Sequence, residues 1–337
     1  MKDKIYIDGS LPQWKGNLHL HTTRSDGRAT PAEAMAAYKN AGYDFCVMSD
    51  HEVYWNSDEL DSEGFIVLGG VESGVERNPN TLWEVGGTSN LCLHLHAIRD
   101  ARSECEPFPH DKKVAHIRDT GVDSWQKNID YLKSRGNFII LNHPRWSRIE
   151  PEQMLSINGY FAVEVYNHCS EVLETTGESE YEWDYCLRRG KHVWAVAADD
   201  NHSYAPEDKH CFGGFTMVSA PCLTREALSD GFREGTFYAS TGPVIKDMRV
   251  TNGVLHMEFS PAQAVRLVAS RDFEPTLTPP LGQKTFTSID HKMRTDIRYL
   301  RPEVIGPDGK KAWGQPIFLD GGEADEWIIN HQIVPTP

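Results

Sequence analysis

Short apolar runs recur along the first 200 residues of the chain. They span residues 45–49, 65–71, 91–93, 138–142 and 193–198. Each run has the length and composition of a strand buried on both faces. A residue that can bind a metal follows each run directly. These residues are Asp50 and His51, Glu72, His94, His143, and Asp199, Asp200 and His202.

Helix signals separate the predicted strands. The segment Thr30-Pro31-Ala32-Glu33 joins an N-cap threonine to a proline at the first helical position and a glutamate three residues after the cap. This capping box predicts a helix from about residue 30 to Ala41, ended by Gly42. Further helices are predicted over 123–136 and 178–189. Alternating strands and helices predict an α/β fold, a distorted (β/α)7 barrel within residues 1–220.

The segment 17–27 combines two histidines with a carboxylate. His19 and His21 are two residues apart on a predicted strand, so both side chains point to the same side, while Leu18 and Leu20 point to the other. Asp26 follows shortly afterwards. Paired imidazoles and a nearby carboxylate are ligands that a divalent metal needs. Ligands at the carboxyl ends of barrel strands lie where active sites form.

Several motifs resemble those of the PHP (polymerase and histidinol phosphatase) superfamily of metal-dependent hydrolases, in the same order. They are His19-Leu20-His21-Thr22, Ser25-Asp26-Gly27, the segment 42–51 that ends in Ser49-Asp50-His51, the segment around Glu72, His143-Pro144, and Asp200-Asn201-His202. The stretch 14–51 is most similar to the branch that contains carbaryl hydrolases and predicted phosphoesterases. The resemblance covers most of residues 14–220.

This resemblance implies a seven-stranded barrel with two or three divalent metal ions at its rim. It implies three ligand sets: His19, His21, Glu72 and Asp200; Glu72, His94 and His143; and Asp26, His51 and His202. His94 and His96 would face the same side, so they compete for one position, which we assign to His94. Asp50 would orient a ligand rather than bind a metal.

The implied ligands predict a metal-dependent hydrolase. Nitrogen and oxygen ligands without cysteine suit Zn, Mn or Fe. A metal-bridged hydroxide would attack the substrate, because coordination lowers the pKa of water to about 7. We expect a phosphoesterase that acts on a small phosphorylated metabolite. Two alternatives stay open: hydrolysis of a carbamate, carboxyl ester or amide at the same metals, and a noncatalytic ligand-binding module with structural metals.

Other residues next to the predicted ligands are candidates for catalysis. Arg145 follows His143-Pro144 and could hold a phosphate or carboxylate, and Trp146 could stack on a ring. Tyr204, two residues after His202, could donate a proton to a leaving group. We assign Arg145 and Tyr204, with His94, to the catalytic set.

The chain changes pattern after residue 220. Residues 221–245 predict a helix over 224–234 and a turn-rich connection over 236–243. Residues 246–337 alternate in polarity, and Pro-Asp-Gly at 307–309 predicts a hairpin turn. We therefore expect a small β-sandwich-like domain. It could be structural, form an interface in a homo-oligomer, bind a ligand or complete the cleft.

Charge indicates which class of partner the protein binds, and cysteine content indicates its location. The formal net charge is −15, and the first 245 residues hold 37 acidic against 23 basic residues. Such a field disfavours nucleic-acid binding, which needs basic patches, and favours a small-molecule substrate. No apolar stretch is long enough to cross a membrane. A charged N-terminus and seven cysteines without a Cys-x-x-Cys pair predict a cytoplasmic protein.

Overall fold

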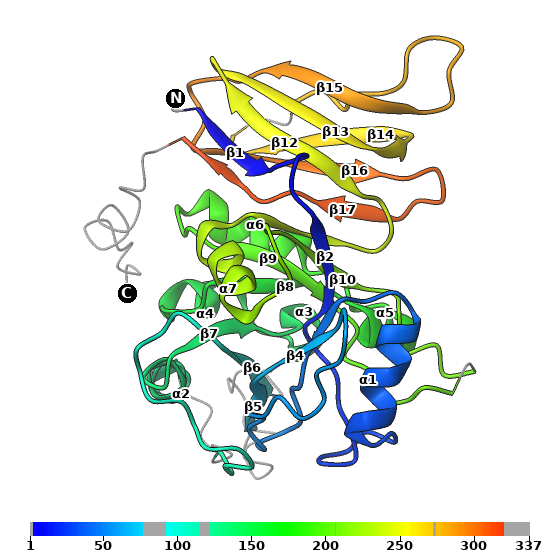
Figure 1. Cartoon of the computed structure of the whole chain (residues 1–337). Helices are drawn as coiled ribbons and strands as arrows, with labels where there is room; N and C mark the ends of the chain where they lie inside the picture. Colours follow the sequence, from blue (N-terminus) through cyan, green and yellow to red (C-terminus); the bar gives the residue numbers. More distant parts are fainter. Residues whose placement is uncertain (1–2, 77–91, 115–121, 206, 272–273, 320–337) are drawn as a thin grey trace, which may run out of the picture.

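The computed structural model describes residues 3–76, 92–114, 122–205, 207–271 and 274–319 (Figure 1). The helices are α1 (Pro31–Asn40), α2 (Val122–Lys133), α3 (Pro144–Ser147), α4 (Pro151–Ser156), α5 (His168–Glu174), α6 (Glu180–Arg188) and α7 (Arg225–Glu234). The first strands are β1 (Lys4–Ile7), β2 (Gln13–Asn17), β3 (Phe45–Val47), β4 (Ile66–Leu68), β5 (Gly70–Glu76), β6 (Cys92–Arg99), β7 (Asn137–Leu141), β8 (Ala162–Asn167) and β9 (Trp194–Ala198). The later strands are β10 (Phe215–Ser219), β11 (Phe237–Ser240), β12 (Ile245–Thr251), β13 (Val254–Ala262), β14 (Ala264–Ala269), β15 (Phe286–Lys292), β16 (Tyr299–Ile305), β17 (Lys311–Trp313) and β18 (Ile317–Phe318).

The longer helices form where the sequence predicts them. The capping box of α1 is complete: the Thr30 side chain accepts from the Glu33 backbone N–H, and the Glu33 side chain accepts from the Thr30 backbone. Helix α7 follows its N-cap Thr224 and ends at Gly235, which has a φ of 73°. The short helices α3, α4 and α5 were not predicted, because four to seven residues carry too little periodicity.

The strands form three sheets. One has the order β5-β6-β7-β8-β9, and a second has the order β1-β12-β13-β15. The third runs β14-β16-β17-β11-β10-β2-β3-β4, with β18 paired to β16. This third sheet therefore continues from C-terminal strands into the N-terminal strands that precede the predicted ligands (Figure 1).

The predicted closed barrel does not form among the described residues. Strands β2 to β4 and β5 to β9 lie in separate sheets, which meet at isolated bridges such as Leu20–Asn201 and His51–Glu72. A uniform (β/α) barrel needs parallel neighbours throughout. Here β6 is antiparallel to both β5 and β7, and β2 is antiparallel to β10. The mixed pairing directions explain why the architecture is α/β but not a regular barrel.

The strand predicted around His19 and His21 ends earlier than expected. Strand β2 stops at Asn17, and the histidines follow on extended chain held by the bridge of Leu20 to Asn201. The predicted alternation nevertheless holds. Leu20 is fully buried in an apolar cluster, while the two rings approach each other with Nε2 atoms 3.2 Å apart.

The C-terminal strands pack around a core of their own. Side chains from β12, β13, β14 and β16 share one buried apolar cluster, to which Tyr6 and Ile7 of β1 also belong. Strand β1 pairs with β12, so the first strand of the chain joins the sheet made by later residues. The Pro-Asp-Gly turn connects β16 to β17 as predicted, with Gly309 at a φ of 82°. The expected connection 236–243 contains strand β11. The domain limits at residues 220 and 245, and the β-sandwich beyond them, stay predictions.

A charged network joins α6 to the C-terminal strands. Glu180 accepts hydrogen bonds from Lys311 Nζ at 2.9 Å, Trp313 Nε1 at 2.8 Å and Arg266 Nη2 at 2.6 Å. Burial alone would raise the pKa of Glu180, but Lys311 and Arg266 lower it below its ordinary value of 4.5. The carboxylate therefore stays charged and holds the two parts of the molecule together.

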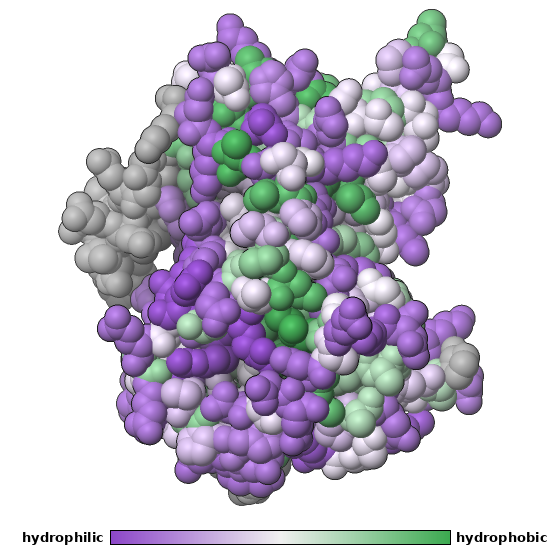
Figure 2. Space-filling view, in the orientation of Figure 1, coloured by the Kyte–Doolittle hydropathy of each residue, from purple (hydrophilic) through white to green (hydrophobic). Residues whose placement is uncertain are grey.

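The surface is mostly hydrophilic on the face shown in Figure 2, with hydrophobic residues gathered near its middle. Among the described residues, none of the helices combines the length and the apolar character needed to cross a membrane. The described cysteines are free thiols: Cys46, Cys105, Cys169, Cys186, Cys211 and Cys222.

Replacing Glu180 should destabilise the fold. Glu180→Ala leaves Lys311 without one of its two acidic partners in a partly buried network, so we expect a loss of about 3 kcal/mol. Because the folded-state pKa is lowered, this contribution is present above the ordinary pKa of 4.5 and is lost as the pH falls below it. Urea unfolding at pH 7 and pH 3 measures both effects.

The matched control is Glu63→Gln, at an exposed position, which should change stability by less than about 0.5 kcal/mol. Equal unfolding midpoints for Glu180→Ala and wild type at pH 7 would contradict the role of this network.

Candidate metal centre

The nine residues predicted as metal ligands converge at one place. His19 and His21 follow β2, His51 follows β3, and Glu72 and His94 lie in β5 and β6. His143 follows β7, Asp200 and His202 follow β9, and Asp26 lies in the loop before α1. Their donor atoms form three groups in which all atoms lie within 4.8 Å of one another. These groups are His19, His21, Glu72 and Asp200; Glu72, His94 and His143; and His21, Asp26, His51 and His202.

The first group is the most buried. His19 Nε2 lies 3.3 Å from Glu72 Oε1 and 3.0 Å from Asp200 Oδ1. His21 Nε2 lies 3.2 Å and 3.1 Å from oxygens of the same two carboxylates. Ligands about 2.1 Å from one ion, at tetrahedral or octahedral angles, are about 3.0 to 3.4 Å apart. The donor atoms of this group therefore have the spacing that a single divalent ion requires.

The second group shares Glu72 with the first. Glu72 Oε1 lies 3.1 Å from His94 Nδ1 and 3.4 Å from His143 Nε2. One carboxylate could thus bridge two ions. His96, the alternative to His94, is buried against the His19 ring at 3.9 Å between centroids, and its Nε2 has no hydrogen-bond partner among the described residues. The geometry thus groups His94, and not His96, with Glu72.

The third group is the most open to solvent. Asp26 is 56% exposed, and its Oδ2 lies 3.6 Å from His51 Nε2 and 3.5 Å from His202 Nε2. His21 Nδ1 lies 3.5 Å from Asp26 Oδ1. These distances are longer than those of the first group, and they are compatible with an ion at a solvent-accessible position.

Charges in the cluster move several pKa values away from their ordinary range. Burial alone would lower the pKa of His19, but Asp200, Glu72 and Glu164 raise it well above 6.5. Burial alone would raise the pKa of Glu72, but the neighbouring imidazoles lower it well below 4.5. The Glu72 carboxylate therefore stays charged at neutral pH, and the carboxylates around His19 favour the protonated form of its ring.

Two of the predicted ligands sit in unusual backbone conformations. His143 has a φ of 27° and Asp200 a φ of 55°, in the left-handed region that residues with a Cβ rarely adopt. Asp199 helps to hold the second bend, since it accepts from the backbone N–H groups of Gly213 and Gly214. Such strain is typical of functional sites.

Buried polar side chains fix the ligands in place. Asp50 accepts from Thr22 N at 2.8 Å and Ser25 Oγ at 2.8 Å, so it shapes the loop that carries Asp26. This agrees with its predicted orienting role. Asn142 Nδ2 donates to Glu72 Oε1 at 2.7 Å.

Glu164 is a further acidic residue beside the ligands that the sequence pattern does not indicate. It lies inside β8, is buried, and its Oε1 is 3.0 Å from His19 Nδ1. Its signal in the sequence is a lone carboxylate between Val163 and Val165 in an apolar strand. Because no turn or second ligand follows it directly, the pattern used for the other ligands did not detect it.

A cavity of about 340 Å³ opens beside the three groups, which is large enough for a small molecule. Trp146, Leu173 and Glu174 form its outer wall. Trp146 Nε1 donates to Glu174 Oε1 at 3.2 Å. No lysine or arginine of the described chain lines this cavity; its other lining residues are Asp26, His51, Glu72, His94, His143, Cys169, Ser170, Asp200, His202 and His210.

Arg145 and Tyr204 lie away from this cavity. Arg145 is exposed, donates to the Glu178 carbonyl at 3.3 Å and lines a separate hollow between α6 and β14. The ring of Tyr204 packs in the apolar cluster of Leu20 and Tyr38, and burial raises its pKa. The structure therefore does not bring these two residues together with the predicted ligands.

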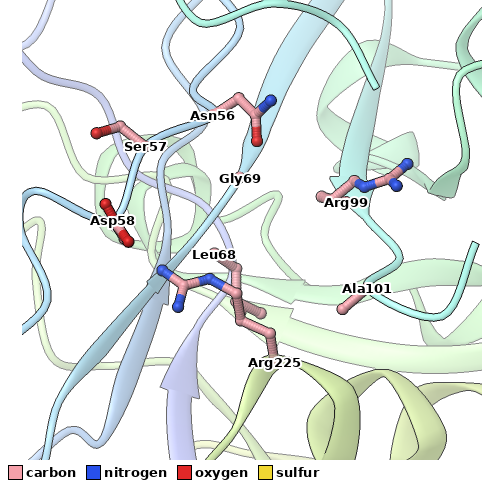
Figure 3. A pocket seen from close by; sticks show the side chains of 8 residues that line it. All are labelled: Asn56, Ser57, Asp58, Leu68, Gly69, Arg99, Ala101 and Arg225. Carbon is pink, nitrogen blue, oxygen red and sulfur yellow. The ribbon is translucent and has the colours of Figure 1, made fainter. Parts of the chain in front are cut away.

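A second hollow of about 390 Å³ contains two arginines but no metal ligands from the three groups (Figure 3). Arg225 is paired with Asp61 at 2.8 Å. Arg99 points away from the other labelled side chains and donates to the carbonyls of Ser103 and Arg135. Both cations are thus engaged within the protein, and the candidate site is the histidine cavity.

Zinc binding at pH 7 should release protons. Burial lowers the pKa of His202, but Asp26 and Asp200 raise it to about 11, and the pKa of His19 is also raised. A metal must displace these protons, so affinity should increase as the pH rises from 6 to 8. Calorimetry in two buffers of different ionisation enthalpy measures the release, and equal heats in both buffers would contradict it.

Known proteins offer structural but not sequence matches. No protein-family model matches the chain, and no curated protein matches it. A two-domain protein containing a predicted PHP-like metal-dependent phosphoesterase from Bacteroides vulgatus ATCC 8482 is similar over 94% of this chain and 99% of its own, with 17% identity and a TM-score of 0.49.

Two further solved structures are each 14% identical to the chain. A structure from Bifidobacterium adolescentis ATCC 15703 carries the description of a metal-dependent phosphoesterase. It matches over 57% of this chain and 89% of its own, with a TM-score of 0.40. An amidohydrolase from Chromobacterium violaceum, with bound sulfate and no metal, matches over 58% and 90%, with a TM-score of 0.38. The first of the three structures is named as PHP-like, and none of the three is named as a carbaryl hydrolase.

Proposed function

We propose that this protein is a metal-dependent hydrolase that acts on a small phosphorylated metabolite. The observation that carries the proposal is the set of three donor groups, joined through Glu72 and His21, at the base of one cavity. The donors are imidazoles and carboxylates, which suit two or three ions of Zn, Mn or Fe.

Electrostatics favour an anionic substrate. Three carboxylates belong to the groups: Asp26, Glu72 and Asp200. Three divalent ions among them leave a net positive charge, to which a phosphate group is attracted. Because no lysine or arginine of the described chain lines the cavity, the phosphate would bind at the ions and the organic part would lie against the outer wall.

The chain's own residues orient the ligands, contact the substrate and exclude water from it. Ions held by the three groups would supply Lewis acidity and would lower the pKa of bound water. Asn142 fixes the Glu72 carboxylate by a hydrogen bond of 2.7 Å, so the shared ligand cannot rotate freely. Trp146 and Leu173 cover the organic part of the substrate and reduce the water around it.

A carbonyl substrate is the second candidate. The apolar wall of Trp146 and Leu173 and the lack of a described basic residue in the lining favour an uncharged carbamate, ester or amide. Ions held by the same donor groups would polarise its carbonyl oxygen. A substrate panel separates the two candidates, because the charge at the reacting centre differs.

The double variant His19→Ala/His21→Ala should lose hydrolysis. It removes both imidazoles of the most buried group, so we expect fewer bound ions and a fall in kcat/KM of at least about a hundredfold. Metal content is measured by mass spectrometry. Turnover is measured with a panel of phosphomonoesters, phosphodiesters, carboxyl esters and carbamates. The control His256→Ala removes an imidazole on β13 that lies outside the donor groups. It should keep both the metal content and the turnover of the wild type.

The panel has three informative outcomes. Turnover of phosphate esters that disappears in the double variant supports the proposal. Turnover of carbonyl substrates alone would move the protein to the second candidate. Bound metals without turnover of any ester or carbamate would favour a noncatalytic ligand-binding module.

Trp146→Ala should weaken substrate binding more than catalysis. Its ring lines the cavity beside His143, at 4.9 Å between ring centroids, and it offers no metal ligand. We expect KM to rise about tenfold, or about 1.4 kcal/mol, with kcat changed less than threefold. The control Tyr181→Ala removes an exposed aromatic ring from a different hollow. A fall in kcat without a change in KM would contradict the role of the wall.

Composition supports a proposal for the location and the partners of the protein. Free cysteines support a reducing, cytoplasmic location. The acidic chain supports a small-molecule substrate rather than a nucleic acid.

A further inference from the structure

Glu164 touches two of the predicted ligands from behind. It is 1% exposed, and its Oε1 lies 3.0 Å from His19 Nδ1. Its Oε2 accepts from the backbone N–H of His143 at 2.9 Å and from Asn167 Nδ2 at 2.9 Å. Three N–H groups therefore converge on one buried carboxylate.

The contact with His19 decides which ring nitrogen carries a proton. A carboxylate only accepts hydrogen bonds, so Glu164 requires a proton on His19 Nδ1. The lone pair of the neutral ring then lies on Nε2, which faces His21, Glu72 and Asp200. This is the tautomer that can bind an ion in the first group.

The other oxygen of Glu164 reaches the second group. His143 adopts a φ of 27°, and its N–H would be buried without a partner if the carboxylate were absent. Asn167, which also donates to Glu164, donates to Asp200 Oδ2 at 3.1 Å. Glu164 thus connects His19 and Asp200 of the first group to His143 of the second.

We propose that Glu164 is a positioning residue that sets the tautomer of His19 and the backbone of His143, so that both neighbouring metal groups form together. This inference rests on the proposed function, because it takes the donor groups to hold ions. Partners that orient metal-binding histidines typically contribute ten- to hundredfold to metal affinity.

Glu164→Gln separates this role from simple packing. Glutamine has nearly the same shape but offers one acceptor oxygen and one NH₂ donor. If the oxygen keeps the bonds to His143 and Asn167, the NH₂ faces His19 Nδ1. The ring must then carry its proton on Nε2, where it blocks the ion. The variant should therefore keep its shape and lose metal affinity.

The test is zinc titration of wild type and Glu164→Gln, with chelator competition and mass spectrometry of bound zinc. We expect the variant to bind zinc ten- to hundredfold more weakly, or to lose at least one ion. The matched control is Glu303→Gln, which changes another buried carboxylate, on β16, that pairs with Arg301 and Arg266 outside the donor groups. The control should lower the melting temperature and keep zinc affinity within threefold.

Zinc affinity of Glu164→Gln within threefold of wild type would overturn the positioning role while leaving the proposed function intact. A wild type that binds no zinc, manganese or iron would overturn the proposed function itself. A second measurement covers a variant that does not fold. In zinc-loaded wild type with ¹⁵N-labelled histidine, the His19 signal, assigned with His19→Ala, should show the proton on Nδ1. A proton on Nε2 would overturn the inference.

Discussion

One buried carboxylate, Glu72, is the feature on which the rest of the site depends. Five imidazoles lie within 3.5 Å of its two oxygens: His19, His21, His51, His94 and His143. A buried negative charge is costly unless cations and hydrogen bonds surround it. These rings come from segments far apart in the chain, so the ends of many strands meet around this one carboxylate.

The two sheets meet beside this carboxylate. Glu72 lies on β5 of one sheet, while His51 follows β3 of another, and the two residues form an isolated bridge. Leu20 and Asn201 form a similar bridge beside His19 and Asp200. Segments that follow β2 and β3 of one sheet therefore meet β5 and the segment after β9 of the other sheet at the donor groups, and the cavity opens there. The sheet that contains β3 continues through β11 and β17 into the C-terminal strands.

The sequence was sufficient to predict which donor side chains come together, but not all of their surroundings. Residues such as His51 and His143 directly follow apolar runs, and that local pattern is visible in the chain. Glu164 lies within a strand, and only the fold reveals that His19 is its neighbour. Arg145 follows His143 closely, yet the left-handed bend at His143 leads into α3, on which the arginine contacts Glu178. Pairing directions of strands depend on distant segments, so the α/β class was predicted correctly, but the distorted (β/α)7 barrel does not close among the described residues.

The most direct test of the metal centre is a crystal structure of the zinc-loaded protein, with anomalous scattering recorded at the zinc edge. Two or three peaks are predicted among the donor groups. One should lie between His19, His21, Glu72 and Asp200, and another between Glu72, His94 and His143. A loaded crystal with no peak at these residues, or with peaks only elsewhere on the surface, would contradict the account.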